Sequence, residues 1–531
     1  MGYFVEKLLS TFLSYKNVRK RGRFMDKETL SHYGWIVILV LILSVLLALA
    51  SPFGNFIVSA IKSTTAGFFS VNEGALGAAG IIIPGQSFDN EDIPAEPTRD
   101  PALNPDDGTE PSDGETYFDS VYIYTYSSAI DGWAVTLNLE KTDRAQTTYP
   151  VILESINGKL IRSLYGTFAS CSQLTTPPEV PYGVTNMNQT FYACQKLGDM
   201  SGYVIPSNVK TMEKTFYVCS SLTLGPTIPD SVENINYTFW RCSRLSTAPT
   251  LGKGIKTMNQ TFYFCSELKT APVIPYGVTN MSATFQYCDK LTETPKIPET
   301  VQNLSGTFAY CTRLTVAPKI PSGATNISGM LMLCTSMKTY EGSTDPDGDF
   351  SDYKLPEGIT SIGTTFNHLD CMIIAPYIPD SVENMNGAFG DCWQLQTVQN
   401  LPKNLKDMSL AFVGCTKLET VPAIPEGTQN MKEAFESCHY LKSISPIPSS
   451  VTNLQETFNE CERLEGTIYI NSVPTYYTNC FGLKNSATGK NITLDGPVPP
   501  AFLYALAQSS PAGKRIMYGT VEYRGSYIYK Q

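Results

Sequence analysis

A repeat of about 23 residues, marked by cysteine, constrains the fold of this chain more than any other feature of its sequence. Of the thirteen intervals between its fourteen cysteines, nine are 23 residues long. At the first thirteen cysteines, Phe stands three residues before the Cys in eleven cases, and Leu stands three residues after it in eleven. A single unit of this length cannot bury its own apolar face, whereas stacked neighbours can, so the pattern predicts a solenoid.

One unit runs from Cys265 to Tyr287 and reads CSELKTAPVIPYGVTNMSATFQY. Its L-x-x-A-P-x-I-P part should be extended, because Pro fixes φ and disfavours helix in the residue before it. In T-F-x-x-C the Phe and Cys are three residues apart, which predicts one turn of α or 3₁₀ helix. The predicted fold is therefore a β-rich α/β repeat solenoid, with short parallel strands and one helical turn in each coil.

The cysteines are predicted to be buried free thiols. Each occupies the same inward position, so neighbouring side chains run parallel, whereas a disulfide needs converging Cβ atoms about 3.5–4.5 Å apart. No C-x-x-C pair of the kind that binds zinc is present. A column of Asn just before the Met position should satisfy backbone groups at a bend of each coil. This column comprises Asn186, Asn234, Asn280, Asn303, Asn326, Asn384, Asn430 and Asn453.

The region before the repeats carries the signals of a membrane anchor. Residues 1–34 contain seven Lys or Arg and three acidic residues, and residues 35–61 contain no charged side chain. Roughly 20 apolar residues cross a bilayer, so a single transmembrane helix is predicted over 35–61. Basic residues on its N-terminal side place the head in the cytoplasm and the rest outside. A cleaved signal peptide is the alternative, because Ala48 and Ala50 form an A-x-A site.

Two further segments depart from the repeat. Residues 62–115 include an acidic, Pro-rich stretch that cannot bury enough apolar surface to offset its ordering entropy, so they are predicted to be an extended spacer. Residues 340–353 interrupt the period and lengthen one interval between cysteines to 37 residues. Aligned on cysteine, the flanking units have Leu331 and His368 at the Phe position and Met337 and Ile374 at the Leu position.

The motif I-P-x-x-V-T-N-M-x-x-T-F-x-x-C-x-x-L resembles the BspA-type leucine-rich repeats of bacterial surface proteins and of some protists. The resemblance covers residues 165–465 and implies a leucine-rich-repeat solenoid there. It also implies a β-rich N-terminal cap over 116–164 and a C-terminal cap over 466–531. In the latter, Tyr477, Cys480 and Leu483 resemble a degenerate repeat. The basic head and single span resemble the leader of surface proteins carried on mobile elements of gut Firmicutes.

The family resemblance implies adhesion or partner binding outside the cell. The predicted location is therefore the cell membrane, with a single span, a cytoplasmic N-terminus and extracellular repeats. The expected partners are the membrane, through that span, and an unknown extracellular protein or glycan. A passive structural stalk or shield of the cell envelope, without a specific ligand, is the alternative function.

Candidate binding residues lie next to the T-F-x-x-C segment, in the coils before the insertion. They are aromatic residues that follow the inward Phe directly or at the next position, and they should form an exposed stripe of the kind that binds proteins or sugars. Rings packed flat between coils would instead indicate a stabilising role. The predicted residues are Tyr192, Tyr217, Trp240, Tyr263, Phe264, Tyr287 and Tyr310.

Other functions find less support in the sequence. The insertion supplies possible Ca²⁺ ligands, but the EF-hand template fails because Phe350 stands where Gly is required and Pro356 where Glu is required. A solvated acidic loop is predicted instead. A formal net charge of −10 argues against nucleic-acid binding. Without G-x-S-x-G, Walker or G-x-G-x-x-G motifs, no enzyme and no cofactor are predicted. The calcium candidates are Asp345, Asp347, Asp349 and Asp352.

Overall fold

The structure, a computed structural model, describes residues 108–483 and 492–509, together with the backbone of three C-terminal strands. All of these belong to one compact unit, Ala95–Gln531. The predicted cytoplasmic head, the predicted anchor and the spacer up to residue 107 lie outside the described residues. Among the helices that the structure describes, none combines the length and the apolar character that crossing a membrane requires.

A five-stranded sheet forms the N-terminal cap. Its strand order is β1-β2-β3-β5-β4, and only the contact of β3 with β5 is parallel. Tyr122, Tyr124 and Tyr126 alternate inward along β2, and the indole Nε1 of the buried Trp133 donates to the carbonyl of Ile156 at 3.0 Å. The strands are β1 (Thr116–Phe118), β2 (Tyr122–Ser127), β3 (Gly132–Leu137), β4 (Ser155–Ile156) and β5 (Lys159–Ser163).

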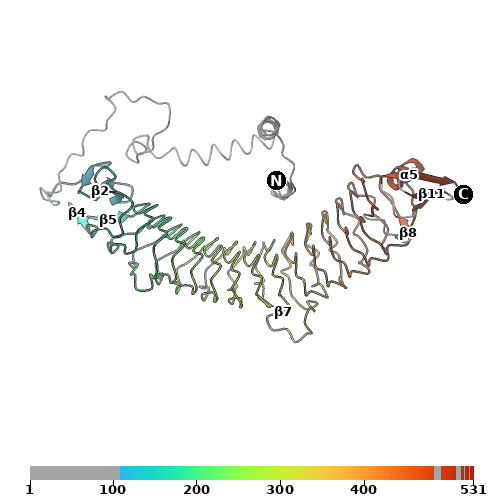
Figure 1. The fold of residues 1–531 in the computed structure, drawn as a ribbon, viewed down its shortest axis with the longest axis horizontal. Coiled ribbons are helices and arrows are strands. Elements are labelled where there is room, and N and C mark those ends of the chain that lie inside the picture. Colours follow the sequence, from blue (N-terminus) through green and yellow to red (C-terminus); the bar gives the residue numbers. More distant parts are fainter. Residues whose placement is uncertain (1–107, 484–491, 510–515, 519–520, 525–526, 531) are drawn as a thin grey trace, which may run out of the picture. The chain divides into compact units, whose positions relative to one another are not determined.

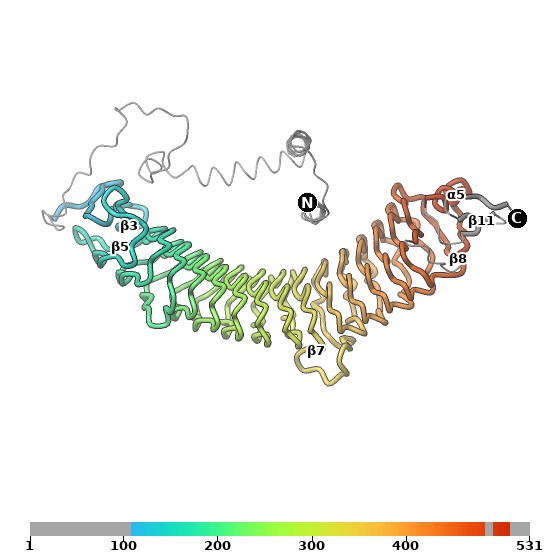
Figure 2. The backbone as a smooth tube through the Cα atoms, in the orientation of Figure 1, coloured from blue at the N-terminus to red at the C-terminus, as the bar shows by residue number. Residues whose placement is uncertain are grey.

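After the cap, the coils stack side by side in sequence order (Figures 1 and 2). On either side of the insertion, the residue before the Met position forms a parallel bridge with its counterpart in the next coil, for example Asn186 with Thr211 and Thr211 with Asn234. Within the described solenoid, bridges lengthen into paired strands only at β6 (Val316–Ala317) and β7 (Thr339–Tyr340). The coils thus form a β-rich repeat fold in which extended contacts are short.

The helical turn predicted for each coil is wrong. In the coil that ends at Cys194, Gln189 and Ala193 have φ of 57° and 58°, whereas a right-handed helical turn needs a negative φ at every residue. The segment instead makes three successive tight turns, in which the N–H groups of Thr190, Tyr192 and Cys194 donate to the carbonyls three residues earlier. The N–H of Phe191 therefore points along the stack and donates to the carbonyl of Thr215 in the next coil at 2.9 Å.

Val218, with a φ of 59°, is with Thr364 one of two β-branched residues in the left-handed region among the described residues, and a β-branched side chain is a steric outlier there. Gly has no such penalty. We expect Val218→Gly to stabilise the protein by about 1 kcal/mol, measured by denaturant unfolding. Val204 is 75% exposed and has a negative φ, so Val204→Gly is the control and should give no gain. A loss of stability in Val218→Gly would contradict the prediction.

Phenylalanine rings form the spine of the core. Seven rings from Phe168 to Phe308 stack in series, with centroids 5.5–5.7 Å apart. A second stack of six rings runs from Phe366 to Phe481, with centroids 5.3–5.7 Å apart. All of these rings are almost completely buried. Below we call these two series the phenylalanine ladders.

The thiols are free, and thirteen of the fourteen are buried, as predicted. A repeated hydrogen bond explains why Cys suits this position: the Sγ of Cys265 donates to the carbonyl of Phe239 in the preceding coil at 3.2 Å. The Asn column is also confirmed. The Oδ1 of each of its eight members accepts the N–H of the residue two positions later, at 2.8–3.1 Å.

The repeat register after the insertion differs from the alignment on cysteine. Phe366, not His368, occupies the Phe position, because its ring stacks on Phe389 at 5.3 Å. Its carbonyl accepts the thiol of Cys392 at 3.0 Å. The fully buried Leu369 then takes the Cys position, which leaves Cys371 off the column and partly exposed. After the insertion, the cysteine therefore stands two residues later than the Cys position of the coil.

The repeat register at the end of the solenoid also differs from the alignment on cysteine. Phe481 stacks on Phe458 at 5.5 Å, and the N–H of Phe458 donates to the carbonyl of Cys480 at 2.8 Å. Phe481 therefore fills the Phe position that the sequence alignment gives to Tyr477, and Cys480 takes the place of the Thr that precedes Phe in other coils. Twelve of the fourteen cysteines share one position, since Cys371 and Cys480 do not.

The insertion 340–353 is more than a solvated loop. Its chain projects beyond the neighbouring coils just after β7 (Figure 2), but it returns two aromatic rings to the core. Phe350 is fully buried and Tyr353 is 3% exposed. The hydroxyl of Tyr353 donates to the carbonyl of Pro318 at 2.8 Å, and its ring lies edge-on to Phe366 at 6.4 Å. Tyr353 thus packs against the first ring of the second phenylalanine ladder, and Leu331 takes the Phe position between the two ladders.

A second sheet and one helix form the C-terminal cap. The strand order is β12-β11-β10-β9-β8, with parallel pairs at β8-β9 and β9-β10. The helix α5 (Pro500–Gln508) begins at a proline and buries Phe502, Leu503 and Leu506. The strands are β8 (Gly466–Tyr469), β9 (Ile492–Asp495), β10 (Ile516–Tyr518), β11 (Val521–Arg524) and β12 (Tyr527–Lys530).

Candidate functional site

The seven predicted binding residues form one continuous series of ring contacts, which we call the aromatic column. Its first part consists of residues that directly follow the inward Phe in successive coils. Tyr192 and Tyr217 stack with centroids 4.8 Å apart, Tyr217 and Trp240 at 4.4 Å, and Trp240 and Tyr263 at 5.4 Å. The ring planes deviate from parallel by 6° or less. This part of the column is therefore a flat stack.

After Tyr263 the aromatic side chain of the column stands one position later in the repeat. In the next coil the position after Phe285 is Gln286, and the ring of Tyr287 beside it takes over. Tyr287 lies edge-on to Tyr263 at 5.5 Å and tilted against Phe264 at 5.6 Å. It then stacks on Tyr310 at 4.2 Å. The sequence prediction that these aromatics are adjacent in space is thus correct, although their orientation changes along the series.

The aromatic column lies outside the core. Six of its members are partly exposed, and Phe264 is 37% exposed. In the flat stack the ring faces cover one another, so the accessible parts are ring edges and polar tips. The column therefore combines the two arrangements that the sequence left open. Its rings pack flat between coils, as a stabilising element would, and they also reach the surface.

Backbone groups along the column are already occupied. The carbonyl of Tyr217 accepts the N–H of Ala193 at 2.7 Å, and the carbonyl of Trp240 accepts the N–H of Val218 at 2.7 Å. These contacts between coils hold each ring at the spacing of the stack. Burial among the neighbouring rings raises the pKa of Tyr217, so its phenol stays protonated and can donate a hydrogen bond.

Arg241 is a member of this surface that sequence reasoning missed. Its guanidinium carbon lies 4.7 Å from the centroid of the Trp240 ring and 5.2 Å from that of Phe264. Arg241 is exposed, and within the described residues its side chain makes no ion pair or hydrogen bond. Its position in the sequence could have identified it, because Arg241 stands directly before Cys242. At the same position the following coils have Phe264, Tyr287 and Tyr310.

The second half of the solenoid also exposes aromatic side chains, at positions after the cysteine rather than before it. Trp393 is 48% exposed and Tyr440 is 41% exposed. The guanidinium carbon of Arg463 lies 3.7 Å from the centroid of the Tyr440 ring. No ring stack joins Trp393 to Tyr440 in the described structure, so these residues differ from the continuous column of the first half.

The four aspartates of the insertion do not converge. Asp345 accepts the hydroxyl of Tyr340 at 2.5 Å, Asp349 accepts the N–H of Ser351 at 2.9 Å, and Asp352 pairs with Lys354 at 3.4 Å. Asp347 is exposed. Across the part of the chain that the structure describes, no three His, Cys, Asp or Glu side chains are grouped so that they could hold a metal ion. The structure gives the calcium hypothesis no geometric support.

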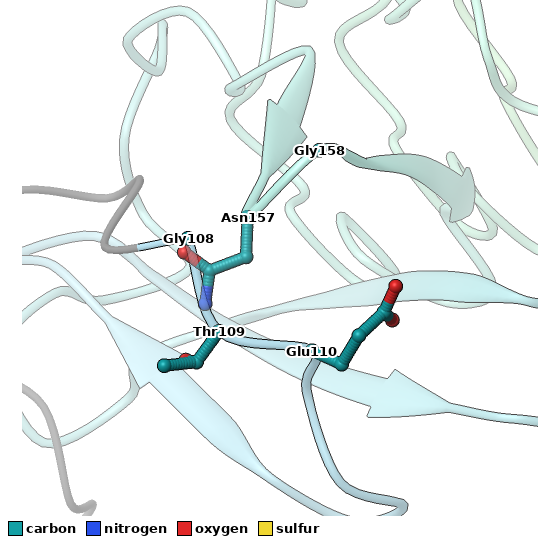
Figure 3. A pocket seen from close by; sticks show the side chains of 5 residues that line it. All are labelled: Gly108, Thr109, Glu110, Asn157 and Gly158. Atoms are coloured by element: carbon teal, nitrogen blue, oxygen red, sulfur yellow. The ribbon is translucent and has the colours of Figure 1, made fainter.

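A shallow hollow lies where the described chain enters the N-terminal cap. Figure 3 shows its lining, in which Gly108, Thr109 and Glu110 pass the turn between β4 and β5. Asn157 and Gly158 form the other side of the hollow. Glu110 pairs with Lys159 at 3.4 Å. The contact attaches the entering chain to the cap, and we assign it no chemistry.

Comparison with known proteins gives two positive results. A family model described as BspA type Leucine rich repeat region matches residues 155–246, 188–315 and 360–488, in six copies. A crystal structure of a leucine-rich cell surface protein from Faecalibacterium prausnitzii is 22% identical. It covers 75% of this chain and 98% of its own, with a TM-score of 0.43.

Two further structures are similar. A leucine-rich repeat protein from Bacteroides ovatus is 17% identical, covers 76% of this chain and 99% of its own, and has a TM-score of 0.43. The pneumococcal vaccine antigen PcpA is 15% identical, covers 76% of this chain and 98% of its own, and has a TM-score of 0.41. No curated protein matches the chain.

Proposed function

Because the chain belongs to the family of BspA-type leucine-rich-repeat proteins, we propose that it is a cell-surface binding protein whose solenoid presents the aromatic column to a protein or glycan ligand. The single observation that supports this proposal most is the continuity of the column. Seven aromatic residues in six successive coils are in ring contact at the surface, and none of them belongs to the core.

Membrane attachment is the second part of the proposal. The apolar, uncharged residues 35–61 and the basic residues before them support a single span with a cytoplasmic head and external repeats. The acidic, Pro-rich spacer would then hold the solenoid away from the bilayer. We assign the protein no enzymatic role, because the column and the shallow hollow offer hydroxyls, ring edges and isolated charges rather than a nucleophile with its base.

A passive stalk is the competing function, and the flat stacking of the rings favours it in part. Stacked aromatic pairs contribute about 0.5–1.5 kcal/mol each beyond area burial. A purely structural column would also explain the parallel planes of Tyr192, Tyr217 and Trp240. The two functions differ in what the loss of these rings should do, since only a binding protein would lose a ligand.

The double substitution Trp240→Ala/Tyr263→Ala should abolish binding of the protein to host or bacterial surface fractions. Large aromatics near the centre of an interface cost about 2 kcal/mol or more when truncated. Some stability will also be lost, because Trp240 stacks on both Tyr217 and Tyr263. Pull-down of surface fractions by the two proteins, at a temperature where both are folded, measures the effect.

Trp393→Ala/Tyr440→Ala is the matched control, since it removes the same two residue types from exposed positions in the second half. This control should bind as the unmodified protein does. Absence of binding by all three proteins would favour the passive stalk, and equal binding by all three would place the site outside both pairs of residues. Loss of binding only in the control would move the site to the second half of the solenoid.

A further inference from the structure

We propose that the aromatic column, together with Arg241, binds a linear glycan that carries carboxylate groups. This inference rests on the binding function proposed above and names the chemistry of its ligand. Three features of the surface support it: the orientation of the stacked rings, the surroundings of the Arg241 guanidinium, and the polar atoms that remain available along the column.

The first feature is the part of each ring that a ligand can reach. Between Tyr192 and Tyr263 the rings are parallel within 6°, so each face inside the stack lies against another ring. The partial negative charge of an aromatic ring resides on its faces, and the partial positive charge resides on its edge. The exposed edges therefore form a weakly positive surface. Such a surface favours oxygen-rich, negatively charged ligands over apolar ones.

Arg241 adds a full positive charge to this surface. Trp240 and Phe264 lie within 4.7 and 5.2 Å of its guanidinium carbon, while its N–H groups have no protein acceptor within the described residues. A guanidinium held in this way presents two parallel donors, which match a carboxylate.

The remaining polar atoms favour a glycan over an acidic peptide. In the described structure the hydroxyls of Tyr192, Tyr217 and Tyr263 make no hydrogen bond, and they stand in three of four successive coils, with Trp240 in the remaining one. A hydroxyl both donates and accepts, so this row suits the regularly spaced hydroxyls of a polysaccharide. An extended peptide binds through the main chain of a strand edge. Along the column those main-chain groups are occupied by contacts within and between coils.

Binding of the full-length protein to polygalacturonate and to hyaluronate tests the inference. Methyl-esterified polygalacturonate has the same sugar chain without the charge, and it should bind at least 10-fold more weakly, because charge-assisted hydrogen bonds are lost. Arg241→Gln should weaken binding of polygalacturonate by roughly the same factor. Arg463→Gln removes a second exposed, ring-stacked arginine of the described solenoid and should leave binding unchanged.

Four outcomes would overturn the inference. Equal binding of free and esterified polymer would remove the role of the carboxylate, and unchanged binding by Arg241→Gln would remove the role of that side chain. Binding of poly-L-glutamate with the same affinity and the same dependence on Arg241 would identify an acidic protein as the ligand. If neither glycan binds but Trp240→Ala/Tyr263→Ala still loses surface binding, the proposed function stands and only the glycan assignment fails.

Discussion

Phe262→Ala should lower the free energy of unfolding by about 3–5 kcal/mol. Phe262 is fully buried and stacks on Phe239 at 5.5 Å and on Phe285 at 5.6 Å, so its removal leaves a cavity and ends two ring contacts. The surrounding backbone can shift little to fill this cavity, because the N–H of Phe262 is bonded to the carbonyl of Thr284 at 2.9 Å. The backbone is therefore pinned to the next coil.

Denaturant unfolding of the full-length protein in mild detergent measures the change. Phe264→Ala is the control, since the same residue type lies two positions away and is 37% exposed. It should cost about 1 kcal/mol or less. Hydrogen exchange should show the loss in Phe262→Ala concentrated in the flanking coils, because stacked repeats are stabilised mainly by nearest neighbours. Equal losses in the two variants would show that the phenylalanine ladder does not dominate stability.

Thiol reagents should label the native protein at Cys371 alone. Thirteen thiols are buried, whereas Cys371 is partly exposed. Burial also raises the pKa of the Cys334 thiol to about 12 and that of Cys265 further. Since the thiolate is the reactive form, these buried side chains should be unreactive near pH 8 for two reasons, poor access and lack of charge.

Alkylation followed by mass spectrometry tests this prediction. Native protein should carry one label, and Cys371→Ser should carry none. After denaturation without reductant, all fourteen cysteines should react, because none is in a disulfide. Labels that remain missing until a reductant is added would reveal disulfides. Rapid native labelling at Cys265 or Cys334 would show that the solenoid opens more readily than its packing indicates.

The inward columns were predictable because each coil buries the same positions. Phe, Cys and Leu recur at fixed spacing, and a position that is buried once per coil tolerates few residue types. The Asn column was predictable for a different reason. Its side-chain oxygen accepts the N–H two residues later, as Asn186 does from Asn188, and this local bond depends on few other residues.

The path of the chain between the inward positions was not predictable. A spacing of three residues between Phe191 and Cys194 fits one turn of helix, and it also fits the tight turns that the structure shows. The choice depends on the sign of φ at Gln189 and Ala193. Neither residue type marks a left-handed conformation, so the hydrogen bonds between coils decide it.

Register and surface chemistry were predicted only in part. Alignment on cysteine failed at Cys371 and Cys480, where Phe366 and Phe481 keep the core positions instead. Ring size and burial, rather than the thiol, define the coil. The location of the aromatic column was predicted from the sequence. The stacking of its ring faces and the position of Arg241 against Trp240 were not predicted. Both depend on the distances between neighbouring coils, which the sequence of one repeat does not determine.

The hydrogen bonds of the turn segments give the solenoid a polarity. N–H groups of the turn segment donate to carbonyls of the coil that follows, as Phe262 does to Thr284, while other N–H groups donate to the coil before, as Thr279 does to Lys256. A cut between coils would therefore leave unpaired donors and acceptors on both ends. Two such ends are complementary, and copies joined head to tail would form an open fibre. In the intact protein the series ends on the C-terminal cap, where Asn479 donates to Ser509. We therefore expect the caps to keep a self-complementary array from polymerising.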